Sequence, residues 1–253
     1  MFFRERGTNP LVIVLSPGKS GSSSVYNTIK QILSMRVEHL HFISPSGISK
    51  EWSRNLKGPR RSVPLHLLHA FTSRDTIFDS NRKRFVFVIV RDPREWVISA
   101  IFQNLDTFDG ALDSGCNVNF EIVEREVGKS FKSIGGDLDQ WFDEEIKKPF
   151  GIDVFSSSSK KSQCVEIFEN GNVKLLLEKI EELKAITPEI LNSFFETTQF
   201  HKEFQFSYNN VSKNKFYGTE YLEFKSKFQI DHLDYKNLMQ SRYVQKFYGQ
   251  DFV

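Results

Sequence analysis

The chain has 253 residues, enough for one large domain or two small ones with a substantial buried core. Its 34 Lys and Arg residues nearly balance 32 Asp and Glu residues, and the formal net charge of +2 excludes the global basic field of a general nucleic-acid binder. Two cysteines, Cys116 and Cys164, form no CxxC motif and argue against a zinc site or a disulfide framework. We therefore expect neither a metal centre nor a nucleic-acid partner.

The N-terminal residues do not read as a targeting segment. The sequence MFFRERGTNP carries charges too early for the apolar core of a signal peptide. No later run approaches the roughly 20 apolar residues of a membrane span. We expect a cytoplasmic protein with no membrane span.

The first predicted strand is the apolar run Leu11–Leu15, and a helix is predicted at 22–35. A small, polar turn of sequence SPGKSG lies between them. A turn that begins a helix leaves free backbone N–H groups at the positive end of the helix dipole. The sequence therefore predicts an anion-binding loop at this position.

The strongest predicted strand is 85–90, six apolar residues without alternation, which is typical of a parallel strand covered on both faces. Arg91, Asp92 and Pro93 follow it, and we expect Pro93 to begin a helix that Asp92 caps. Between the two strand–turn–helix segments, a short apolar stretch at 37–43 precedes a Ser/Pro/Gly-rich turn at 44–47. A basic loop follows at 57–61, either a solvated turn or a contact for an anionic sugar.

The later elements are predicted from caps, turns and periodicity. They are helices at 119–131 and 137–147, a surface loop at 156–162, two strands around Asn170-Gly171, a helix capped by Thr187 with Pro188 in its first turn, and helices at 219–228 and 234–248. No internal repeat or domain boundary appears. The sequence predicts a single α/β domain over 1–253, a three-layer sandwich around a central, mostly parallel sheet.

Two classes of phosphate-binding loop compete for the stretch around Lys19. Gly18-Lys19-Ser20 resembles the end of the kinase and ATPase motif GxxxxGK[ST], with Asp92 as a possible magnesium ligand. The first glycine of that motif would fall at Ile13, inside the strand, so the spacing argues against ATP. A P-loop nucleotide kinase or ATPase is therefore the alternative reading.

The same stretch resembles the 5′-phosphosulfate loop of sulfotransferases that use 3′-phosphoadenosine 5′-phosphosulfate (PAPS). Their pattern is Pro-Lys-Ser-Gly-Thr-Thr, and this chain has one extra glycine and serines for threonines. The resemblance implies a P-loop-like sulfotransferase fold, and it assigns cofactor binding to Lys19, Ser20, Gly21, Ser22, Ser23 and Ser24. Arg91 and Ser99 match that superfamily's 3′-phosphate pair: they are eight residues apart, at a strand end and about two helical turns along.

More narrowly, the chain resembles the sulfotransferase-like capsular polysaccharide synthesis family, which is named for the motif Asn-Lys-Trp-Tyr-Ser. Residues 214–218 read Asn-Lys-Phe-Tyr-Gly, and the blocks GKSGSSSVYN, HLHFISP, VRDPREWVISAIFQNLD and FGIDVF are also similar. The resemblance implies that Lys215 and Tyr217 help to hold the 3′-phosphate and the adenine. Gly218 in place of serine removes one hydroxyl donor.

The reaction that the resemblance implies is in-line transfer of a sulfuryl group from PAPS to a hydroxyl of a carbohydrate or other small acceptor, without a metal. Lys19 is the candidate cation for the leaving phosphate. Among six histidines, His69, 22 residues before Arg91, is the first candidate base, and His41 is the second. A structural role for either histidine remains open, as does a non-catalytic nucleotide-binding relative.

Overall fold

The computed structural model describes residues 9–57, 65–156, 160–162, 165–201, 204–206, 215–229 and 232–249. The chain divides into two compact units, which are described separately below. The first unit contains Met1–Val90 and Glu144–Ser207, and the second contains Arg91–Asp143 and Tyr208–Val253. The single domain over 1–253 stays a prediction.

The first unit is built on a sheet of six strands in the order β2-β1-β3-β6-β5-β4. The strands are β1 Leu11–Leu15, β2 Arg36–Leu40, β3 Arg84–Val90, β4 Lys160–Ser162, β5 Val165–Asn170 and β6 Val173–Lys179. The pairs β1–β2, β1–β3 and β3–β6 are parallel, and β5 and β4 add an antiparallel edge. The prediction of an α/β fold with a mostly parallel sheet is confirmed.

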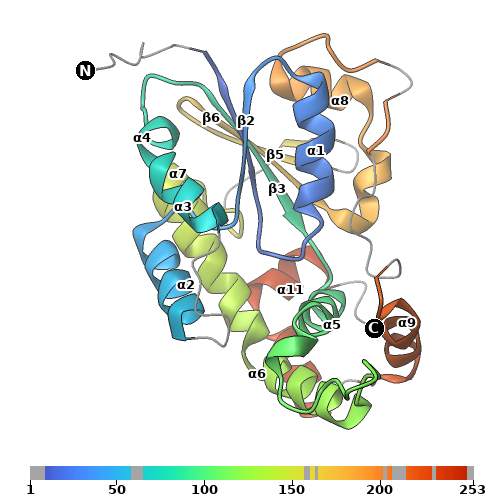
Figure 1. The fold of residues 1–253 in the computed structure, drawn as a ribbon. Helices are drawn as coiled ribbons and strands as arrows, with labels where there is room; N and C mark the ends of the chain where they lie inside the picture. The colour runs from blue at the N-terminus through green and yellow to red at the C-terminus, as the bar shows by residue number, and fades with distance from the viewer. Residues whose placement is uncertain are drawn as a thin grey trace. The chain divides into compact units, whose positions relative to one another are not determined.

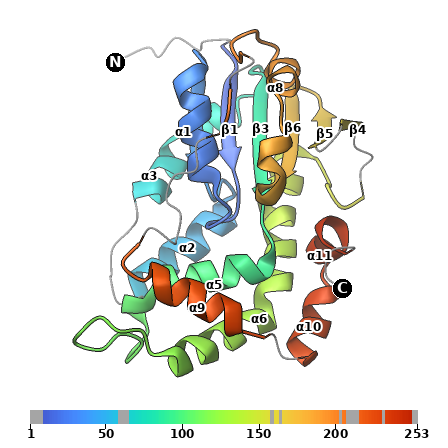
Figure 2. The ribbon, with the colours of Figure 1, turned by 90° about the vertical axis from the view of Figure 1, so that its right-hand side faces the viewer.

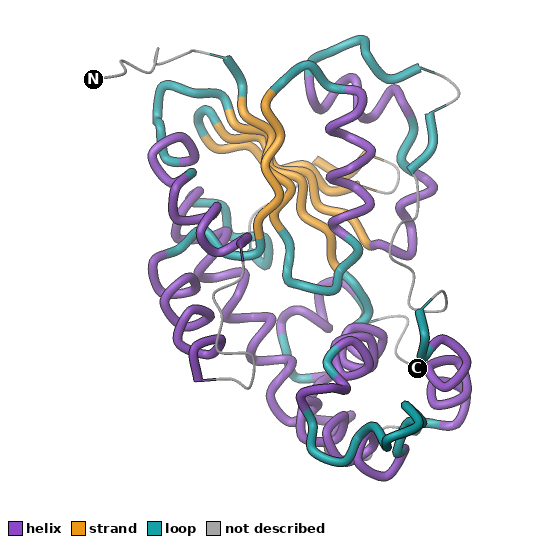
Figure 3. The backbone as a smooth tube through the Cα atoms, in the orientation of Figure 1, coloured by secondary structure: helices purple, strands orange, loops and turns teal. Residues whose placement is uncertain are grey.

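Helices cover both faces of this sheet (Figure 3). Helices α1 (Ser22–Ile32) and α8 (Pro188–Phe195) lie along one face (Figures 1 and 2). Helices α3 (Leu65–Thr72) and α4 (Arg74–Ile77) lie on the opposite face. The predicted strand Leu11–Leu15 is fully buried, as a strand covered on both faces must be.

Helix α2 (Pro45–Lys57) corrects the prediction of a turn at 44–47. Ser44 caps this helix, since its Oγ accepts from Gly47 N (2.9 Å) and donates to Glu145 Oε1 (2.6 Å). The other oxygen of Glu145 accepts from the backbone N–H groups of Ile43 (2.6 Å) and Ser44 (2.7 Å). Burial raises the pKa of Glu145, and these hydrogen bonds act in the opposite direction. One buried carboxylate thus fixes the connection between β2 and α2.

Two further predictions for the first unit are confirmed, the hairpin of β5 and β6 and the cap of α8. The β5–β6 hairpin turns at Gly171, where φ is 53°, and Thr187 Oγ1 accepts from Ile190 N (3.4 Å) to cap α8. The other elements are the π-helical turn Asp143–Lys147, which spans the boundary between the units, α7 Lys148–Phe150 and the 3₁₀-helix Ile180–Ala185. The loop predicted at 156–162 instead contains strand β4, and residues 157–159 lie outside the described part of the chain.

The described part of the second unit is helical. Its elements are α5 Pro93–Gln103, the 3₁₀-helix Leu105–Thr107, α6 Phe120–Phe142, α9 Gly218–Lys227, α10 His232–Met239 and α11 Arg242–Phe247. Asp92 Oδ1 accepts from Arg94 N (2.8 Å), which confirms the predicted cap of α5. The helices predicted at 119–131 and 137–147 are one helix through residue 142, and 234–248 contains two helices because Ser241 caps α11. None of the described helices is long and apolar enough to cross a membrane.

Gly47→Ala should destabilise the protein, although alanine normally favours a helix. A Cβ atom at Gly47 would lie 2.1 Å from Glu145 Oε1, and that oxygen is held by hydrogen bonds. We expect a loss of about 1–3 kcal/mol in the free energy of unfolding, the usual cost of overpacking. Urea unfolding followed by circular dichroism measures it.

Gly128→Ala is the matched control, because a Cβ at this α6 position meets nothing within 4 Å. This variant should gain up to about 1 kcal/mol from helix propensity. A Gly47→Ala protein as stable as the Gly128→Ala protein would contradict the buried Glu145 contact.

Candidate functional site

The loop between β1 and α1 contains two residues in the left-handed region of backbone conformation. The dihedral φ is 70° at Lys19 and 85° at Gly21, and Ser20 between them has no positive φ. Backbone that alternates between right-handed and left-handed residues forms concavities lined by N–H groups. A Cβ at Gly21 would lie 2.7 Å from Ile180 Cδ1, so both conformation and space favour glycine there. Of the predicted residues, Lys19, Ser20 and Gly21 thus lie in a tight turn before α1, and Ser22, Ser23 and Ser24 form the first turn of α1.

Ser20 stands out among the serines of this loop. Its side chain is 1% exposed, and its Oγ has no hydrogen-bond partner within the described structure. A buried hydroxyl without a partner costs about 1–3 kcal/mol, so folded proteins rarely keep one without a reason. No side chain caps α1. The loop therefore keeps an unpartnered hydroxyl close in sequence to the start of α1.

His41 is tied to the start of the same loop. Its Nδ1 donates to the carbonyl oxygen of Ser16 (2.9 Å). A carbonyl can only accept, so Nδ1 carries the proton and the neutral ring has its lone pair on Nε2. The His41 ring lies edge-on to His39 (5.0 Å), and His39 Nε2 is 2.9 Å from Ser22 Oγ. His41 thus has the tautomer that a general base requires.

His69 has a different environment. Its Nε2 lies 3.1 Å from Glu38 Oε2, and Arg36 also pairs with this carboxylate, which is only 4% exposed. Neighbouring residues of a strand point to opposite faces, and His39 contacts Ser22 of α1. Glu38 and His69 therefore lie on the face of the sheet away from α1, whereas His41 is bonded to the loop.

Arg91 and Ser99 of the second unit are separated by Glu95, four residues from each. Arg91 Nη2 lies 3.6 Å from Glu95 Oε2, and Lys225 Nζ lies 2.8 Å from the other oxygen of Glu95. Ser99 is buried on α5 with 6% exposure. Burial raises the pKa of Tyr221, and a hydrogen bond with Arg91 works in the opposite direction. Arg91, two residues before α5, thus shares the carboxylate of Glu95 with Lys225, and Ser99 lies one helical turn beyond Glu95 on α5.

Most of the predicted motif 214–218 is described, from Lys215 to Gly218. The Lys215 carbonyl accepts from Gly218 N (2.8 Å) in a turn before α9. Tyr217 is 3% exposed and packs on Phe102, with ring centroids 5.7 Å apart, whereas Phe216 is 69% exposed. Tyr217 therefore packs in the core of its unit, and its role in cofactor binding stays a prediction. Asn214 lies outside the described residues, as do positions 58–61 of the basic loop.

Sequence reasoning missed Ser16. Its Oγ accepts from Ile89 N (2.8 Å), and its backbone carbonyl accepts from His41. A serine directly after a buried strand is the available signal, because backbone groups at a strand end need new partners. Among the described residues, no group of three or more His, Cys, Asp or Glu side chains could hold a metal ion.

Comparison with known proteins identifies one family. The family model described as "Putative capsular polysaccharide synthesis protein" (NKWYS) matches residues 109–249, more than half of the chain. The match includes the motif at 214–218 and the helices α6 and α9 to α11. No curated protein and no solved structure matches the chain. The chain belongs to the NKWYS family of capsular polysaccharide synthesis proteins.

Proposed function

We propose that this protein transfers a sulfuryl group from PAPS to a hydroxyl of a carbohydrate or another small acceptor. The observation that carries the proposal is the loop before α1, with its buried, unpartnered Ser20 hydroxyl and two left-handed residues. Such a loop suits a tetrahedral anion with several acceptor oxygens. Membership of a capsular polysaccharide synthesis family supports a glycan as the acceptor.

The residues of the loop fit the 5′-phosphosulfate group. PAPS supplies a sulfuryl group already activated on a phosphate. Ser20 would donate its hydroxyl proton to a phosphate or sulfate oxygen, and the backbone N–H groups at the start of α1 would do the same. We assign Lys19 to the charge that develops on the leaving phosphate, where a fixed cation stabilises the transition state more than the ground state.

Arg91 and the residues of α5 that follow it fit the 3′-phosphate. Arg91 already pairs with a carboxylate at 3.6 Å, so its guanidinium is held where it can exchange that partner for a doubly charged phosphate. Lys225 gives Glu95 a second partner, so Glu95 would stay paired after such an exchange. Ser99 contributes a hydroxyl donor in this assignment, and Lys215 and Tyr217 remain further candidates.

For the base, the contacts favour His41 over His69, the reverse of the order suggested by sequence. The hydrogen bond to Ser16 holds the proton of His41 on Nδ1 and connects the ring to the cofactor loop. His69 is instead paired with Glu38, on the face away from α1. An acceptor hydroxyl would lose its proton to Nε2 of His41 as the sulfur–oxygen bond forms.

Arg91→Ala should remove most of the preference for a 3′-phosphate. We expect the wild type to bind adenosine 3′,5′-bisphosphate more tightly than adenosine 5′-phosphate. The variant should lose about 1.5–3 kcal/mol of binding free energy for the bisphosphate and none for adenosine 5′-phosphate. This is the usual contribution of a charged hydrogen bond. Isothermal titration calorimetry with both nucleotides and with Mg-ATP measures this.

Arg94→Ala is the control, because Arg94 pairs with Asp92 (2.5 Å) and has no assigned phosphate contact. Its nucleotide preference should equal that of the wild type. An equal loss for both nucleotides in Arg91→Ala would refute the second half of the site. Binding of Mg-ATP alone by the wild type would instead indicate the kinase or ATPase alternative.

Ser20→Ala should separate stability from binding. Removing an unpartnered buried hydroxyl should leave the free energy of unfolding unchanged or raise it by up to about 1–3 kcal/mol. Affinity for the bisphosphate should fall by about 0.5–1.5 kcal/mol, one neutral hydrogen bond. Ser44→Ala removes a donor to the buried Glu145 carboxylate. This variant should lower the free energy of unfolding and leave the affinity for the bisphosphate unchanged. If both variants destabilise the fold equally, Ser20 is a structural residue.

His41→Ala should lower turnover by about 10²–10⁴-fold, the contribution of a general base. His69→Ala should have a much smaller effect, and Lys19→Ala should lower kcat far more than it lowers nucleotide affinity. The assay is transfer of radiolabelled sulfate from PAPS to a saccharide panel. A larger effect of His69→Ala would restore the order suggested by sequence, and nucleotide binding without any transfer by the wild type would indicate a non-catalytic relative.

A further inference from the structure

The backbone of Arg91 is held by a single hydroxyl group. Strand β3 ends at Val90, so the strand ladder ends one residue before Arg91. Tyr243 Oη accepts from Arg91 N (2.9 Å) and donates to the Arg91 carbonyl oxygen (2.7 Å). A phenol is both a donor and an acceptor, so this one atom satisfies both backbone groups. Tyr243 is 1% exposed, which keeps water away from these hydrogen bonds.

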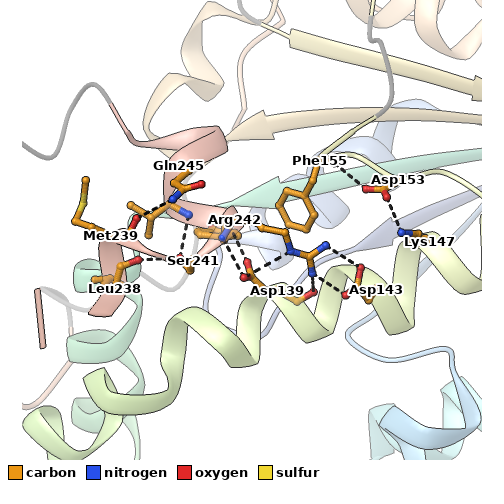
Figure 4. Close-up of polar contacts among 12 residues, drawn as sticks. Asp139, Asp143, Lys147, Asp153, Phe155, Leu238, Met239, Ser241, Arg242 and Gln245 are labelled. Atoms are coloured by element: carbon orange, nitrogen blue, oxygen red, sulfur yellow. Dashed lines mark hydrogen bonds and ion pairs between the residues drawn. The ribbon is translucent and has the colours of Figure 1, made fainter. Parts of the chain in front are cut away.

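Tyr243 is itself fixed to α6 through the start of α11. Asp139 Oδ1 accepts from Tyr243 N (2.8 Å), and Asp139 Oδ2 accepts from Arg242 N (3.0 Å). The guanidinium of Arg242 also reaches Asp143 Oδ2 (2.6 Å), one turn further along the helical segment (Figure 4). A carboxylate at this end of α11 is favoured by both the free N–H groups and the helix dipole.

The ring of Tyr243 is enclosed by other aromatic rings. Its centroid lies 5.9 Å from that of Phe142, 5.2 Å from Phe247 and 6.0 Å from Tyr248. Close packing on several sides leaves the ring little room to change rotamer. The hydroxyl is therefore held in place by the ring packing as well as by its two hydrogen bonds.

We infer that Tyr243 is a positioning residue for Arg91, and that Asp139 holds Tyr243 in place for this task. The inference rests on the proposed function, which assigns Arg91 to the 3′-phosphate. The φ and ψ angles of Arg91 set the direction in which its side chain leaves the backbone, and the tyrosine hydroxyl fixes the groups on both sides of that Cα. Recognition of the 3′-phosphate then depends on α6 and α11 as well as on α5.

Tyr243→Phe keeps the ring and removes only the hydroxyl. The test measures dissociation constants of the full chain for adenosine 3′,5′-bisphosphate and adenosine 5′-phosphate by calorimetry. We expect the preference for the bisphosphate to fall about ten- to a hundredfold, the range lost when a binding group moves by about 1 Å. Affinity for adenosine 5′-phosphate should stay unchanged. If Tyr243 had only a structural role, the variant would bind both nucleotides more weakly by the same factor. That result would overturn the inference.

Asp139→Ala and Asp143→Ala form a matched pair that tests the same inference without touching the phenol. Each variant removes one carboxylate beside Arg242, but only Asp139 accepts from Tyr243 N. The nucleotide preference should fall in Asp139→Ala and stay at the wild-type value in Asp143→Ala. Equal preferences in these two variants would overturn the inference even if Tyr243→Phe failed to fold.

The wild-type measurement separates this inference from the proposed function. A wild type with no preference for the 3′-phosphate would refute the assignment of Arg91 itself. A wild type with that preference, retained in full by Tyr243→Phe, would refute the role of Tyr243 and leave the proposed function standing.

Discussion

Backbone N–H and C=O groups need new partners where a chain leaves a parallel sheet, and in each unit one hydroxyl-bearing residue meets this requirement beside a predicted site residue. In the first unit, Ser16 supplies its hydroxyl to Ile89 N and its carbonyl to His41. In the second unit, the Tyr243 hydroxyl accepts from the backbone N–H of Arg91 and donates to its carbonyl oxygen. The residues that we assign to the reaction thus stand next to backbone that is fixed without any ligand, which lowers the entropic cost of binding.

Ser20 is the exception that gives the loop its chemical character. Ser44 and Ser241 are also buried serines, and each uses its hydroxyl to cap a helix. Helix α1 has no such cap, although a serine precedes Gly21 and is 1% exposed. The sequence thus has the usual capping residue near the start of α1 and does not use it as one. In our proposal, this hydroxyl finds its partner in the bound anion.

Some helix starts can be predicted from local sequence alone, whereas others depend on contacts with residues far away in the chain. Asp92-Pro93 and Thr187-Pro188 are predicted caps, and the structure has helices at both. Ser44-Pro45 carries the same signal, but Gly47 makes the segment resemble a turn. The reason for Gly47 is the approach of Glu145, which comes from a distant part of the chain. A glycine at position 135 is typical of a helix break, but α6 continues through it. The glycine is needed there because a Cβ atom would lie 2.8 Å from Ser241 Cβ.

The same division applies to the candidate site. The predicted anion-binding loop directly follows a strongly apolar strand, which is a local signal, and Arg91 was assigned by its resemblance to a known pattern at the end of a second such strand. Their supports were not predictable, because Tyr243 lies 152 residues after Arg91 and no local pattern connects the two. The ring of Tyr243 packs against other aromatic rings, as an ordinary core residue does. Only its hydroxyl departs from that role, and a one-atom difference between Tyr and Phe becomes meaningful only when its partners are known.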